Sequence, residues 1–116
     1  MYSIEGLTDD PKQQQTVILP NSKSANLYIE YKPMQLGWFL SLDYESFSVK
    51  NVRIVSSPNF FHQFKNLLPF GVACFVQDDQ EPLLQQDFLS GRAKLYILDR
   101  SEVTLYEEIL SGQVSA

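Results

Sequence analysis

The chain has 116 residues, 44% of them hydrophobic and 20% charged, and its formal net charge is −5. This length predicts one domain with a single core, and the composition is typical of globular rather than disordered chains. The nine Lys and Arg residues are scattered, whereas binding to nucleic acid requires clustered cations. The longest apolar run, residues 67–76, falls well short of the roughly 20 residues that span a bilayer. We therefore expect neither a nucleic-acid partner nor a membrane segment.

The first half of the chain predicts antiparallel strands. Residues 9–15 (DDPKQQQ) are polar and predict a loop, and residues 15–20 (QTVILP) predict a short strand that ends at a proline. Residues 26–33 and 37–44 alternate apolar and polar side chains with the period of a strand. The predicted inward faces are Leu27, Ile29 and Tyr31 in the first run, and Trp38, Leu40, Leu42 and Tyr44 in the second. The connection of four or five residues predicts a β-hairpin.

The second half mixes strands with helical turns. Residues 47–57 change the parity of their apolar positions, which predicts a β-bulge near Lys50 and Asn51. Residues 58–71 predict a short helix or a loop with one helical turn. Residues 70–77 predict a central strand, because they are almost continuously apolar, and residues 93–99 predict a further strand. Between these strands, residues 78–82 predict a turn and residues 83–91 a helical turn ended by Gly91.

These elements predict a mainly β fold, a small antiparallel β-barrel or sandwich with one or two short helices. We expect residues 1–116 to form one domain, with an N-terminal strand or loop extension over residues 1–15. Residues 101–116 form a predicted C-terminal extension, in which helical and strand signals compete. It could form a docked helix or a strand given to a neighbouring subunit.

Residues with catalytic or metal-binding chemistry are few and isolated. The only histidine, His62, has no Cys, Asp or second His at ligand spacing, and the only cysteine, Cys74, lies in the most apolar strand. The pairs Asp9–Asp10 and Asp78–Asp79 lack the Gly and Glu of a calcium loop and predict solvated turns. We therefore predict no catalytic residues, no metal site and no cofactor.

The segment NFFHQFKNLLPF, residues 59–70, concentrates apolar side chains in a short connection. A small domain seldom buries every aromatic of such a loop, and exposed aromatic clusters mark protein–protein surfaces. The segment could pack in the core of the chain or contact a partner. The candidate partner-contact residues are Phe60, Phe61, Phe64, Leu67 and Leu68.

The order of the predicted elements from Thr16 to Asp99 resembles the baseplate plug family of cyanophages. The resemblance rests on the apolar start TVIL, the paired runs LYIEYKP and GWFLSLDY, and the segment VKNVRIVSSPNFFHQF that follows them. It continues through GVACFVQDD and LSGRAKLYILD.

The resemblance implies a structural subunit of a phage tail baseplate or hub that acts by packing against other tail proteins, without catalysis. It implies a place in the virion after synthesis in the host cytoplasm, with symmetric copies, three being a natural number around a tail axis. The alternative prediction is a small β-barrel module that binds a peptide or ligand, with residues 59–64 at its mouth. An enzyme that uses His62 and Cys74 is the third hypothesis.

Overall fold

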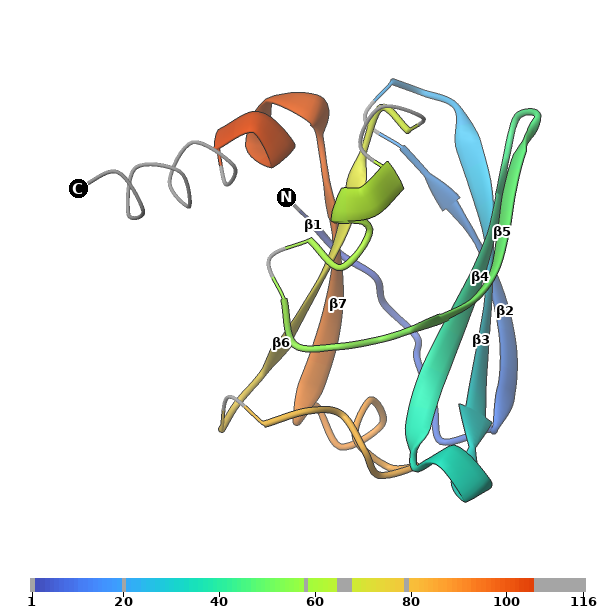
Figure 1. Cartoon of the computed structure of the whole chain (residues 1–116), viewed down its shortest axis with the longest axis vertical. Helices are drawn as coiled ribbons and strands as arrows, with labels where there is room; N and C mark the ends of the chain where they lie inside the picture. Colours follow the sequence, from blue (N-terminus) through green and yellow to red (C-terminus); the bar gives the residue numbers. More distant parts are fainter. Residues whose placement is uncertain (1, 20, 58, 65–67, 79, 106–116) are drawn as a thin grey trace.

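The computed structural model describes residues 2–19, 21–57, 59–64, 68–78 and 80–105, except for the side chains of Tyr2 and His62. The described residues form two antiparallel sheets that face each other, with the longer sheet on one side and the shorter on the other (Figure 1). The predicted mainly β, sandwich-like fold is confirmed. The sheets are not closed into a barrel.

The longer sheet consists of β2 (Lys12–Ile18), β3 (Ser24–Lys32), β4 (Gly37–Tyr44) and β5 (Phe47–Arg53), in that order. Consecutive strands pair antiparallel, so each connection is a hairpin. The predicted central hairpin is confirmed: Tyr31 pairs with Trp38, and Leu27 pairs with Leu42. The predicted inward side chains of both strands are buried in the core, because alternate side chains of a strand share one face. The short 3-10 helix η1 (Pro33–Gln35) closes the hairpin.

The predicted β-bulge lies in β5. Leu40 pairs with Val52 and Leu42 pairs with Val49, so Lys50 and Asn51 together oppose the single residue between the two leucines. Asn51 has a positive φ of 58°, and its N–H donates to the Ser41 hydroxyl. The extra residue allows apolar side chains on both sides of the bulge to face the core. Phe47 and Val49 do so before the bulge, and Val52 and Ile54 do so after it.

The prediction of a loop over residues 9–15 is wrong for its second half, because β2 begins at Lys12. The backbone of these polar residues pairs with β3, from Lys12 with Glu30 to Ile18 with Ser24. The Gln13 amide further donates to the carbonyl oxygens of Thr8 and Asp10. An edge strand half exposed to water accepts polar side chains on its outer face, so hydrophobicity alone misses it.

The shorter sheet consists of β1 (Tyr2–Ser3), β7 (Ala93–Leu98) and β6 (Gly71–Val76), with β7 in the middle. The prediction that residues 70–77 form a central strand is therefore wrong. The free side of β6 carries one isolated bridge, in which Ser57 and Cys74 exchange two N–H to carbonyl bonds of 3.0 Å. This bridge and the loop that follows it shield the free edge of β6 from water. An edge strand that is shielded in this way can be as apolar as a central strand.

Helical structure is short. The helical turn predicted within residues 58–71 is η2 (His62–Phe64), and the turn predicted after residue 83 ends at Gly91, whose φ is 81°. Residues 100–105 are helical, and the rest of the predicted C-terminal extension lies outside the described residues. Asp99 caps this helix reciprocally: its carboxylate accepts the Glu102 N–H at 2.8 Å, and its own N–H donates to the Glu102 carboxylate at 3.1 Å.

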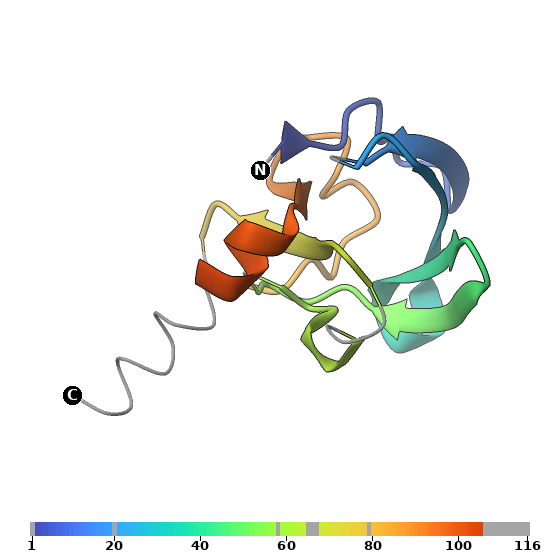
Figure 2. The ribbon, with the colours of Figure 1, turned by 90° about the horizontal axis from the view of Figure 1, so that it is seen from above.

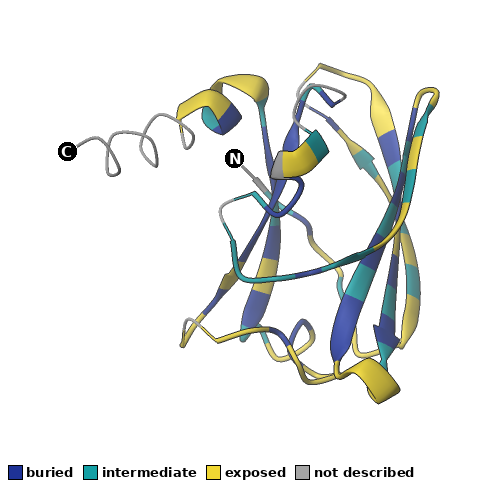
Figure 3. Ribbon diagram, in the orientation of Figure 1, coloured by how far each residue is buried: buried dark blue, intermediate teal, exposed yellow. Residues whose placement is uncertain are grey.

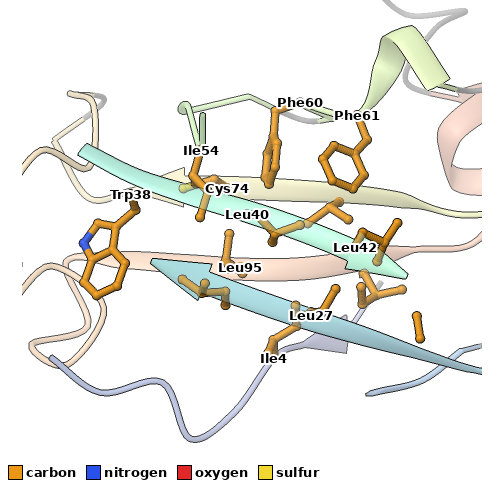
Figure 4. Close-up of a cluster of buried hydrophobic side chains, with 14 of the residues drawn as sticks. Ile4, Leu27, Trp38, Leu40, Leu42, Ile54, Phe60, Phe61, Cys74 and Leu95 are labelled. Carbon is orange, nitrogen blue, oxygen red and sulfur yellow. The ribbon is translucent and has the colours of Figure 1, made fainter. Parts of the chain in front are cut away.

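Figure 2 shows the two sheets from above, and one apolar core lies between them. The strands of both sheets carry buried residues along their length (Figure 3). Both sheets contribute fully buried side chains, among them Leu27, Trp38 and Leu40 from one and Leu95 from the other (Figure 4). The N-terminal segment adds Ile4, and the connection between β5 and β6 adds Ile54, Phe60 and Phe61. The core therefore joins residues from nearly the whole described chain.

Candidate functional site

The predicted partner-contact residues lie where the β5–β6 connection crosses the core. Phe60, Phe61 and Leu68 are buried. Phe61 packs edge-on against Phe60 and Phe64, with ring centroids 5.2 and 5.7 Å apart, and half-buried Phe64 also packs against Phe47. The fifth candidate, Leu67, lies outside the described residues. In the isolated chain the buried three are core residues, and contact of this segment with a partner stays a prediction.

Cys74 and His62 are the other residues singled out for chemistry. Cys74 is fully buried, and desolvation raises the pKa of its thiol to about 12, with smaller contributions from Glu81 and Asp87. The side chain of His62 lies outside the described part of the chain. Within the described residues, no three His, Cys, Asp or Glu side chains form a group that could hold a metal ion.

Of the two acidic pairs, Asp9 and Asp10 are exposed in the loop before β2, as predicted for a solvated turn. Asp78 is exposed but holds Arg92 through a 3.0 Å ion pair. Desolvation raises the pKa of Asp78, but the Gln80 N–H and the charge of Arg92 outweigh it and keep this pKa below its usual range. Asp79 lies outside the described residues.

One end of the sandwich carries an organised surface that the sequence did not reveal. There the β6–β7 loop meets the end of the β3–β4 hairpin (Figure 1). The Tyr31 hydroxyl donates to the Leu83 carbonyl at 2.8 Å, and the Trp38 indole N–H donates to the Leu84 carbonyl at 3.0 Å. Two aromatic side chains of the hairpin thus bind the backbone of the loop directly.

The β6–β7 loop is also fixed from its other side. Buried Asp87 accepts hydrogen bonds from the Leu84 N–H at 2.9 Å and from the Arg92 guanidinium at 2.8 Å. Arg92 donates further to the Glu81 carbonyl. A buried carboxylate requires such partners because removing a charge from water is costly. Asp87 therefore fixes the β6–β7 loop through these hydrogen bonds. The surrounding sequence, LLQQDFLSG, gives no sign of this role.

The hairpin end is held by a second arginine. Arg53 donates to the carbonyl oxygens of Gln35 at 2.8 Å and Leu36 at 3.3 Å. Its guanidinium occupies the space where a side chain at Gly37 would be, since a Cβ there would lie 2.3 Å from an Arg53 nitrogen. Gly37, which has no side chain, makes room for this arginine.

Apolar side chains project from this fixed framework into solvent. Met34 and Leu36 in the hairpin connection are 96% and 59% exposed, and Leu83 and Leu84 in the adjoining loop are 42% and 60% exposed. These four residues are called the apolar end below. The sequence offers no signal that would have located it, because a leucine before a glycine, as at Leu36–Gly37, does not reveal its own exposure.

Comparison with known proteins identifies the family. The family model described as "Cyanophage baseplate Pam3 plug gp18" matches residues 1–101, that is, every described strand and η helix. No curated protein matches the chain. No helix in the described part of the chain is both long and apolar enough to cross a membrane. The chain therefore belongs to the cyanophage baseplate plug family and has a structural role in the phage baseplate.

Proposed function

We propose that the chain is a plug-like subunit of the tail hub, held in the baseplate by packing against other tail proteins, and that it catalyses no reaction. The family match over residues 1–101 carries this proposal. The organised surface at one end of the sandwich supports it, because exposed apolar side chains on a fixed backbone suit protein contact. The chain is made in the host cytoplasm and stays in the virion tail, without a nucleic-acid partner. Symmetric copies surround the tail axis, three being our expectation.

The buried, protonated thiol of Cys74 is the reason for proposing that the chain has no catalytic activity. A thiol with a pKa of about 12 is protonated at neutral pH, and the thiolate is the nucleophilic form. The double substitution His62→Ala and Cys74→Ala should therefore leave assembly and infectivity intact. Loss of infectivity by a double variant that folds and enters virions would contradict a purely structural role.

Location in the virion is tested by mass spectrometry of purified phage particles. We expect the chain at a fixed ratio to the other baseplate proteins, and expect it to remain after high-salt washing because apolar contacts carry no charge that salt could screen. Particles that lack the chain while containing the other baseplate proteins would refute the proposal.

A further inference from the structure

The apolar end is built as a rigid projection. Leu36 adopts a left-handed backbone conformation with φ 48°, which is uncommon for a residue other than glycine and persists only where its surroundings impose it. Here Pro33 opens the connection, and the Leu36 N–H donates back to the Pro33 carbonyl at 3.2 Å. Arg53 binds the two carbonyls that follow Met34. The exposed side chains are thus presented on a backbone that is already ordered.

Two cations flank this projection and share one aromatic ring. Lys32 Nζ and the Arg53 guanidinium each lie 4.8 Å from the centre of the Phe39 ring. Lys32 donates to the Asn51 side chain at 3.1 Å, so the β-bulge helps to position Lys32. Arg53 follows the bulge by two residues on the same strand. Bulges of this kind redirect side chains at the edges of sheets.

Within the described residues, Lys32 and Arg53 form no ion pair with a carboxylate, although acidic residues outnumber basic ones by 14 to 9 in the chain. Lys32 carries three N–H donors and uses one of them in the hydrogen bond to Asn51. Two cationic side chains without an ion-pair partner among the described residues therefore stand beside the exposed apolar side chains.

We propose that the apolar end is the surface by which this chain docks into the baseplate. Its partner is a hub subunit that offers an apolar recess bordered by carboxylates, which would receive Met34 and Leu36 and pair with Lys32 and Arg53. Charge complementarity selects this partner over a second copy, because two copies would bring their cations together. The inference rests on the proposed baseplate function and specifies the surface that performs it.

The test is Leu36→Asp, introduced into the phage genome. Aspartate tolerates the left-handed conformation better than leucine does, so this substitution retains the backbone of the projection. It also places a negative charge against the carboxylates of the partner. We expect the number of copies per virion, measured by quantitative mass spectrometry, to fall at least about tenfold, while the purified variant unfolds at the wild-type temperature.

The matched control is Leu105→Asp, which changes a leucine of similar exposure, 53%, in the helix over residues 100–105. This helix lies at the opposite end of the molecule (Figure 1), and the variant should enter virions normally. Lys32→Glu tests the charge separately and should also reduce incorporation. Equal incorporation of wild type and Leu36→Asp would overturn the docking surface, whereas absence of the wild-type chain from virions would overturn the baseplate function itself.

A further experiment tests whether a second copy of this chain, rather than a hub subunit, covers the apolar end. Sedimentation of the purified wild-type chain should show no association that Leu36→Asp abolishes. If the wild-type chain forms such a dimer, the apolar end is an interface between copies, and the proposed hub partner is wrong.

Discussion

Arg53 can reach the end of the hairpin because Gly37 has no side chain. Its guanidinium lies against the glycine backbone and above the Phe39 ring while it binds two loop carbonyls. A methyl group at Gly37 would meet a flexible side chain rather than fixed backbone, so the arginine, and not the sheet, would move. One glycine thus determines how firmly the apolar end is held.

The ionisation of buried Cys74 links stability to pH on the alkaline side. Burial raises the pKa of its thiol from 9.0 to about 12 in the folded chain. Between these values the unfolded chain has released a proton that the folded chain retains, so the free energy of unfolding falls as pH rises. At about pH 10.5 this loss amounts to about 2 kcal/mol.

This prediction is checked by urea unfolding of wild type and Cys74→Ala at about pH 8 and about pH 10.5. Tyrosines and lysines also titrate in this range, but both proteins share them, so the difference in slope belongs to Cys74. The wild type should lose more stability than the alanine variant over the interval. Parallel losses in the two proteins would show that the thiol ionises in the folded chain about as readily as in the unfolded one.

At the scale of elements, β2 is an edge strand in which residues that bond the backbone of β3 alternate with residues whose backbone points away from it. The Tyr31 N–H donates to the Pro11 carbonyl, and the Leu19 N–H donates to the Lys23 carbonyl. Between these two points the register places Gln15 opposite Leu27 in a hydrogen-bonded pair and turns the backbone of Gln14 away from β3. Neighbouring residues of one strand should therefore respond differently to proline.

We expect Gln15→Pro to destabilise the chain by about 3 kcal/mol or more, because it removes a ladder donor and forces the backbone away from β3. Gln14→Pro should cost only about 1 kcal/mol, since its N–H points away from the sheet. Thermal unfolding of both variants measures the difference. Gln15→Ala is the control for the loss of the Gln15 side-chain bond to the Glu5 carbonyl. A larger loss for Gln14→Pro would mean that the register of β2 is different.

Elements were predictable from the sequence where side chains alternate between core and water. The hairpin around Trp38 and the bulge at Asn51 follow from such parity and are present. The start of β2 was missed because Lys12 and the glutamines after it gain their structure from backbone pairing with β3 rather than from burial. The position of β6 was misjudged because Ser57, in a distant part of the sequence, covers its free edge.

The surface at the apolar end could not be predicted for a related reason. Its parts come from the hairpin end, from Arg53 beyond the bulge and from a loop about 50 residues away, as the 46-residue separation between Trp38 and Leu84 shows. No spacing in the sequence records that these segments meet. An exposed methionine or leucine is also uninformative alone, because single apolar side chains are common on protein surfaces.

At the scale of the whole molecule, one core joins the two sheets, and the β5–β6 connection closes its side. Phe61, only 1% exposed, lies in this connection and packs against Phe60 and half-buried Phe64. Domains of this size have unfolding free energies of about 5–15 kcal/mol, and a buried Phe→Ala substitution costs about 3–5 kcal/mol. Phe61→Ala should therefore remove a large share of the total stability.

Urea unfolding provides the measurement, because a pure loss of stability lowers the midpoint and leaves the denaturant slope unchanged. Phe64→Ala is the matched control: the same atoms are removed from a half-buried ring, so its midpoint should fall less. A Phe61→Ala variant with the wild-type urea midpoint would contradict the packing of Phe61 in the core. The β5–β6 connection would then be better explained as a surface that contacts a partner. A stable Phe64→Ala that enters virions poorly would instead show that the exposed part of its ring contacts a neighbouring subunit, even though Phe61 beside it holds the two sheets together.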